Sequence, residues 1–231
     1  MDKHDDFMKV CQFVRNVGHI YESGDFAFYL YGLVKMIKPS MIVELGTGYG
    51  ATAFLAAQAC KENGRGRVVT VDDGSQWPEK FPYDGFLNEK IKAFKLEKTL
   101  EWRKTAVDML TLKELQDIQE VSVLFNDINC HPEYFLSILS WLLPRVKKEA
   151  YFFIDRGATF WANYCIVELT LDKLNHGKIP ASLYKFYDKP EELEALVRKY
   201  KFSVQYVKKS VSNDQDSFAL VKIEEVDVRI A

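Results

Sequence analysis

The chain has 231 residues, of which 48% are hydrophobic and 28% are charged, a composition that excludes wholesale disorder and fits one globular domain. A formal net charge of −2 excludes a global electrostatic preference for nucleic acid, and no apolar run approaches the ~20 residues that a membrane-spanning helix needs. The four cysteines form no C-x-x-C pair and the acidic N-terminus lacks a signal-peptide pattern, so we expect a cytoplasmic protein without a zinc or dithiol site.

The first 40 residues are predicted to form two helices, because apolar side chains recur at helical spacing over 7–17 and again over 26–37, where Pro39 ends the pattern. These helices are candidates for a homodimer interface. From residue 41 onward, short apolar strands alternate with amphipathic helices, which predicts a parallel sheet covered by helices on both faces. The predicted strands are 41–45, 67–72, 100–106, 121–125 and 151–155, and the predicted helices are 51–62, 88–98, 112–118 and 133–146.

The C-terminal part departs from this alternation. Helices are predicted over 158–175 and 190–200, and strands over 202–207 and 217–223. The polar turn at 212–216 is too short for a parallel crossover, so this last pair must be antiparallel. We therefore predict an α/β fold with a doubly wound, mostly parallel seven-stranded sheet and an antiparallel C-terminal hairpin. It would be a single domain with N-terminal helices (1–40), a core (41–155), an acceptor-site lid (157–189) and a C-terminal helix and hairpin (190–231).

A glycine-rich turn follows the first predicted strand and opens the next helix. It contains Gly46, Gly48 and Gly50, which permit positive φ and let a ligand lie against bare backbone, while the helix start suits an anionic group. The spacing formally satisfies a dinucleotide fingerprint. It equally suits a methyl donor with a carboxylate, an ammonium and a sulfonium, for which Glu44 supplies an acid beside the turn.

The second predicted strand ends in Asp72-Asp73. A carboxylate there can accept hydrogen bonds from both hydroxyls of a ribose. We expect Asp72 to have this role, with Asp73 as the second candidate. The alternative interpretation is a turn pair before Gly74-Ser75.

The passage from Ile37-Lys38-Pro39 through Glu44-Leu45-Gly46-Thr47-Gly48-Tyr49-Gly50 to Val71-Asp72 resembles the class I S-adenosylmethionine-dependent methyltransferases. Within them it most resembles the small-molecule O-methyltransferases of the catechol and caffeoyl-CoA type and their bacterial relatives, over about 21–223. The resemblance implies S-adenosylmethionine as cofactor, with its ribose on Asp72. It implies that the donor's carboxylate lies near Gly46, Thr47, Gly48, Gly50 and Thr52, and its adenine near Ala106, Val107 and Asp108.

Chemistry in such a sheet is expected just after the fourth and fifth strands. The resemblance implies that Asp127 faces both donor and acceptor. In the metal-dependent branch this acid and an Asp-Asn pair hold Mg²⁺, with a lysine three residues after the acid. Here Asp155-Arg156 and Cys130 stand at those places, so a metal on Asp127 and Asp155 is disfavoured. His131 is the candidate general base, the alternative being a helix-entry histidine that bonds to backbone.

These residues predict transfer of a methyl group to a small-molecule acceptor, with a hydroxyl oxygen as the expected target and no nucleic acid or membrane partner. Two other functions stay open: an NAD(P)-dependent oxidoreductase, and a non-catalytic cofactor-binding protein of the same fold. The Tyr31-x-x-x-Lys35 pattern lies before the glycine turn, unlike the arrangement in short-chain dehydrogenases. Residues 157–189 are rich in aromatic side chains and are either a lid or a helix packed on the sheet. Trp77 either covers adenine or packs.

Overall fold

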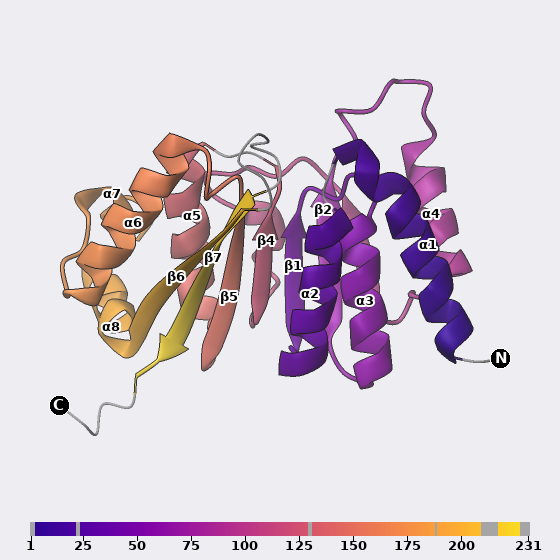
Figure 1. The fold of residues 1–231 in the computed structure, drawn as a ribbon. Coiled ribbons are helices and arrows are strands. Elements are labelled where there is room, and N and C mark those ends of the chain that lie inside the picture. The colour runs from indigo at the N-terminus through magenta and orange to yellow at the C-terminus, as the bar shows by residue number, and fades with distance from the viewer. Residues whose placement is uncertain (1–2, 22–23, 129–130, 188, 209–216, 227–231) are drawn as a thin grey trace. The chain divides into compact units, whose positions relative to one another are not determined.

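The computed structural model describes residues 3–21, 24–128, 131–187, 189–208 and 217–226. The chain divides into two compact units, Met1–Val107 and Asp108–Ala231, and the elements of each can be followed in Figure 1. Their strands belong to a seven-stranded sheet that is parallel except for its C-terminal hairpin. This confirms the predicted fold class.

The first unit contains three parallel strands in the order β3-β2-β1. The register sets Met41 beside Arg67 and Val68 beside Leu100. Strands β1 and β2 are buried over most of their length, as expected for a parallel sheet covered on both faces. The elements of this unit are α1 (Lys3–Tyr21), α2 (Gly24–Ile37), β1 (Met41–Leu45), α3 (Ala51–Asn63), β2 (Arg67–Asp72), α4 (Tyr83–Ala93) and β3 (Leu100–Lys104).

Helix α3 is the helix at the centre of this unit, and its first ten residues are all buried. A helix that is apolar on every side must be covered on every side. Helices α1 and α2 supply part of that cover, and both pack against α3 (Figure 1). The N-terminal helices therefore complete the core of this unit.

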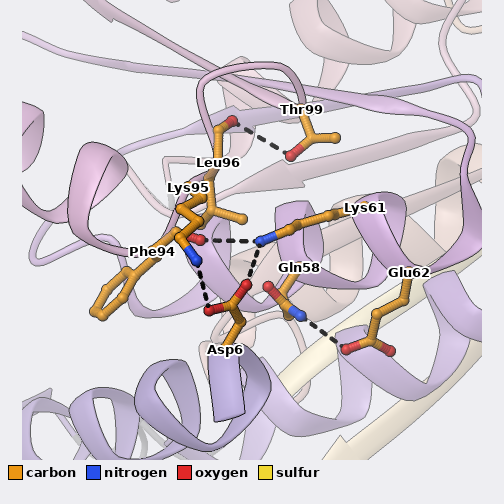
Figure 2. Close-up of polar contacts among 8 residues, drawn as sticks. All are labelled: Asp6, Gln58, Lys61, Glu62, Phe94, Lys95, Leu96 and Thr99. Carbon is orange, nitrogen blue, oxygen red and sulfur yellow. Dashed lines mark hydrogen bonds and ion pairs between the residues drawn. The ribbon is translucent and has the colours of Figure 1, made fainter. Parts of the chain in front are cut away.

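A polar cluster fixes α1 to the rest of the unit. Asp6 on α1 receives Lys61 Nζ at 3.2 Å and Lys95 Nζ at 3.3 Å, and Lys61 also donates to the carbonyl of Phe94 (Figure 2). These two hydrogen-bonded lysines lower the pKa of the Asp6 carboxyl. The cluster joins α1 to the end of α3 and to the turn after α4.

The second unit contains β4 and β5 in parallel, followed by β7 and β6 in antiparallel pairing. The polar turn predicted at 212–216 lies outside the described residues. No helix in the described part of the chain is both long enough and apolar enough to cross a membrane. The elements of this unit are the 3₁₀ turns η1 (Lys113–Leu115) and η2 (Leu143–Arg145), β4 (Val123–Asn126), α5 (Pro132–Leu142), β5 (Glu149–Asp155), α6 (Trp161–Asn175), α7 (Ala181–Tyr184), α8 (Pro190–Lys199), β6 (Tyr200–Lys208) and β7 (Ser217–Glu225).

Several predicted boundaries differ from the structure: the strand predicted at 100–106 ends at Lys104, the one at 121–125 is Val123–Asn126, and the helix at 133–146 is Pro132–Leu142. Three further helices are misplaced. The helix predicted at 88–98 is α4, which begins at Tyr83 and ends at Ala93; the one predicted at 112–118 shrinks to η1; and the one predicted from 158 begins at Trp161. In each case a non-glycine residue with positive φ lies in or beside the misplaced segment: Lys95, Leu112 and Arg156. Such residues reverse the chain where the sequence carries no glycine to mark the turn.

Candidate functional site

The glycine turn connects β1 to α3 through a backbone that glycine makes accessible. Gly46, Gly48 and Gly50 have φ values of 93°, 52° and 80°. At Gly50 a Cβ would lie 2.7 Å from the ring of Phe54, so any larger residue would meet both strain and collision. The turn therefore keeps bare backbone at the N-terminus of a 13-residue helix, an arrangement suited to an anionic group.

The carboxylate of Asp72 accepts hydrogen bonds from the backbone of this turn. The N–H groups of Thr47 and Gly48 donate to its Oδ2 at 2.9 Å and 3.1 Å, and the N–H of Gly74 donates to its Oδ1 at 2.7 Å. A carboxylate offers about four acceptor positions, so roughly one remains for a ligand. Besides its predicted role, Asp72 thus organises the glycine turn, which sequence reasoning missed.

Asp73 has a different environment. Its side chain is exposed, and its Oδ1 accepts a hydrogen bond from the N–H of Ser75 at 2.8 Å. Hydrogen bonding to Ser75 lowers the pKa of this carboxyl, so it is ionised at neutral pH. In this structure Asp73 forms part of a turn, which was the alternative interpretation, and its exposed carboxylate is accessible to a ligand.

Glu44 is fully buried at the end of β1 and begins a chain of hydrogen bonds. Thr70 Oγ1 donates to Glu44 Oε2 at 2.5 Å, and Thr70 Oγ1 lies 2.6 Å from Thr47 Oγ1. A hydroxyl has one proton, so when Thr70 donates to Glu44 it is Thr47 that donates to Thr70. Burial, reinforced by the negative charge of Asp72 and opposed by the Thr70 hydrogen bond, raises the pKa of Glu44 to about 8.

This network joins the glycine turn to the neighbouring strand β2. Glu44 and Thr47 come from β1 and the glycine turn, and Thr70 and Asp72 come from β2. Thr70 was missed in the sequence, although its position two residues before Asp72 places both side chains on one face of the strand. A buried acid with a raised pKa favours a cationic ligand, because a positive charge stabilises its ionised form.

An aromatic cluster adjoins the turn. Tyr83 donates its hydroxyl to the carbonyl of Gly48 at 2.9 Å, and its ring stacks on Trp77 with centroids 5.7 Å apart. The ring centroids of Trp77 and Tyr49 are 4.4 Å apart. Burial and the charge of Asp72 raise the pKa of Tyr83, so the phenol stays a neutral donor. Trp77 thus packs against Tyr49 and Tyr83 in this structure. Its role over adenine stays a prediction.

The remaining predicted cofactor residues lie at the start of α3 and after β3. Thr52 is buried in the first turn of α3. Ala106 is exposed and Val107 half-buried after β3. Asp108 begins the second unit, where its carboxylate accepts hydrogen bonds from Leu110 N–H at 3.0 Å and Thr111 Oγ1 at 2.8 Å.

In the second unit, the candidate catalytic residues follow β4. Asp127 is exposed. His131 immediately precedes α5; its carbonyl accepts the N–H of Tyr134 at 3.0 Å, and its Nδ1 lies 3.4 Å from Glu133 Oε1. The ring is therefore accessible and lies beside a carboxylate. Cys130 lies outside the described residues.

The end of β5 does not form a divalent-metal site. Asp155 Oδ2 lies 3.3 Å from Nε of Arg156, so a fixed cation already occupies the position beside this acid. Among the described residues, no cluster of three histidine, cysteine or acidic side chains is arranged to hold a metal ion. The described residues at the end of β5 do not fit Mg²⁺.

Comparison with known proteins supplies the family. A family model described as a methyltransferase domain matches residues 43–157, and no curated protein matches the sequence. Among solved structures, cofactor-bound Rv0187 from MTB is 15% identical, with a TM-score of 0.59, covering 94% of this chain and 91% of that one.

Two further structures are described as O-methyltransferases. The Bacillus cereus enzyme in complex with SAH is 17% identical, with a TM-score of 0.58 over 94% of this chain and 91% of that chain. TomG from Streptomyces achromogenes, in complex with SAM, is 15% identical, with a TM-score of 0.53 over 98% and 91%. Residues 43–157 therefore belong to a methyltransferase domain, and in strand topology and glycine turn the chain resembles the class I S-adenosylmethionine-dependent methyltransferases.

Proposed function

We propose that the protein transfers the methyl group of S-adenosylmethionine to a hydroxyl oxygen of a small-molecule acceptor. The observation that carries the proposal is the buried Glu44, connected through Thr70 to Thr47 in the glycine turn. The methyl donor brings a cationic ammonium and sulfonium together with a carboxylate, so it suits a helix N-terminus that lies beside a buried acid. Neighbours of the same fold crystallised with SAH or SAM support this choice.

In this proposal each part of the donor has a partner. Its carboxylate lies near residues 46–52, where α3 begins, and its ammonium lies toward Glu44. The ribose bonds to the remaining acceptor position of Asp72 or to the outward carboxylate of Asp73, and adenine lies near 106–108. The buried carboxylate of Asp72, which contacts the turn, would repel a pyrophosphate, which disfavours the NAD(P) alternative.

The proposed reaction is a direct displacement. The acceptor oxygen attacks the methyl carbon along the line of the carbon–sulfur bond, which breaks to leave a neutral thioether. Such a step needs the reacting atoms about 3–3.5 Å apart and aligned. We assign His131 to take the acceptor's hydroxyl proton, with Glu133 beside the imidazolium that forms. Asp127 is assigned to orient the acceptor.

Calorimetric titration tests the cofactor part. S-adenosylmethionine and S-adenosylhomocysteine are expected to bind, whereas NAD⁺ is not. Glu44→Gln should weaken binding of the methyl donor, because the donor's ammonium loses an ionisable partner. The matched control is Glu62→Gln at the other end of α3, where the carboxylate bonds to Tyr31 and Lys35 instead. Equal losses in both variants, or tight binding of NAD⁺, would refute the assignment.

Turnover tests the catalytic part. A panel of phenols and alcohols is incubated with donor carrying a labelled methyl group, and methylated product is counted. With an accepted substrate, His131→Asn should lower kcat by about 10²–10⁴-fold, the range for loss of a general base, and leave donor affinity unchanged. Donor binding without methylation of any acceptor would favour the non-catalytic alternative.

A further inference from the structure

Arg156 follows β5 in a backbone conformation that arginine seldom adopts. Its φ is 53°, in the left-handed region where a side chain is strained. Asp155 ends the strand, so the strain lies at the carboxyl end, where ligands bind in open α/β sheets. Strain of this kind persists where surrounding structure enforces it, and it gathers at binding sites.

The turn that holds Arg156 is fixed against β7 by several contacts. The N–H of Arg156 donates to the carbonyl of Ser217 at 2.8 Å, and Thr159 Oγ1 lies 2.6 Å from Ser217 Oγ. A Cβ added at Gly157 would lie 2.5 Å from the Cβ of Ala219, so the turn is pressed closely onto the strand. The position of Arg156 is thus determined by packing.

The guanidinium of Arg156 is oriented and partly free. Its Nε faces Asp155 Oδ2 at 3.3 Å, and its side chain is 44% exposed. Asp155 is the side-chain partner that the structure gives it within the described part of the chain. The two Nη groups therefore remain to donate in parallel, the geometry that binds a carboxylate in bidentate fashion.

Aromatic surface begins on the same turn. The N–H of Phe160 donates to the carbonyl of Arg156 at 2.9 Å, so the two residues lie one turn of chain apart. Phe160 is 46% exposed and Trp161 73% exposed. Exposed aromatic side chains four and five residues after a partly free guanidinium are suited to a flat ring that carries a negative charge.

We propose that Arg156 binds the carboxylate of the methyl acceptor, which is a planar aromatic acid resting on the Phe160–Trp161 surface. The inference rests on the proposed methyl transfer and adds the charge of its substrate. It also agrees with the misfit of a divalent cation at Asp155, since the arginine supplies the positive charge there. Arg156 is a specificity-determining residue in this scheme.

The test measures binding of matched acids and neutral compounds to the full chain saturated with S-adenosylhomocysteine. The probes are benzoate, 4-hydroxybenzoate and 3,4-dihydroxybenzoate, each beside its carboxamide. A charge-assisted hydrogen bond of about 1.5–3 kcal/mol corresponds to a preference of roughly 10- to 100-fold for the acid. If no acid binds at least several-fold more tightly than its amide, the proposal is wrong.

Two variants separate binding from folding. Arg156→Gly removes the guanidinium and relieves the positive φ, so it should erase the preference for acids while Tm stays equal or rises. Lys38→Gly is the matched control, because Lys38 is also an exposed cation with positive φ (49°), and it should keep the preference. A retained preference in Arg156→Gly, or its equal loss in both variants, overturns the proposal. Failure of S-adenosylhomocysteine to bind the unaltered chain would instead refute the proposed function.

Discussion

Glu44 makes the proposed cofactor binding pH-dependent in a way that can be calculated. With a pKa of about 8 in the ligand-free protein, its carboxyl is almost entirely protonated at pH 6.5. The donor's ammonium is already charged there, since an α-amino group has a pKa of about 7.7–8.0. A cation placed beside Glu44 favours the carboxylate. Binding should therefore release close to one proton per site at pH 6.5.

Calorimetry in buffers of different ionisation enthalpy measures this number directly. The affinity should also increase up to about tenfold for each pH unit between 6 and 7.5, because the protonated acid must ionise before it can pair with the ammonium. Glu44→Gln should show neither effect. Release of less than about 0.3 proton in the unaltered protein, or the same release from Glu44→Gln, would refute the placement of the ammonium at Glu44.

Three further predictions concern stability. Burial raises the pKa of Glu44 in the folded chain, so its contribution to stability is full below about pH 4 and is lost as the pH rises to about 8. The Tm of Glu44→Gln should therefore increase relative to that of the parent over this pH range. A Tm difference that does not change with pH would contradict this. Gly50→Ala should cost about 1–3 kcal/mol in denaturant unfolding, since φ is 80° and a Cβ would meet Phe54, whereas Gly85→Ala, with open space in α4, should stabilise by about 0.5–1 kcal/mol. Asn163 is buried, and neither polar atom of its side chain has a hydrogen-bond partner in the described chain; Asn163→Leu should therefore raise stability by about 1 kcal/mol, and a lower Tm would show that the amide has a partner.

Local patterns were sufficient for the parts of the fold that local physics decides. The run Met41–Leu45, the glycines after it and the apolar start of α3 are adjacent in sequence, so strand, turn and helix could be predicted together. The antiparallel end of the sheet followed from the shortness of its connection. Both β5–β7 and β6–β7 pairs confirm it.

The contacts inside the site could not be predicted in the same way. Asp72 bonds to backbone N–H groups of residues 24 and 25 positions earlier, and every residue has such a group, so the sequence contains no sign of the pairing. Thr70 resembles any other β-branched residue of a strand until Glu44 and Thr47 are placed around it. These interactions depend on the register of β1 against β2, which sets Glu44 beside Thr70.

Non-glycine residues with positive φ explain the misplaced helices. At Lys38, Lys95 and Leu112, positive φ accompanies a hydrogen bond that closes a local turn: to Val34, to Lys92 and to Asp108. Those three conformations are the ordinary means by which a helix or turn reverses without glycine.

Arg156 differs from them, because it follows a strand and its N–H bonds across to Ser217 of another strand. A glycine or asparagine would adopt the same turn with less strain, so folding alone does not account for an arginine there. What arginine adds is a planar cation at the strand end, held by Asp155 on one side and free on the other. The strain is thus best explained by what the guanidinium binds, and relief of the strain in Arg156→Gly should separate that role from stability.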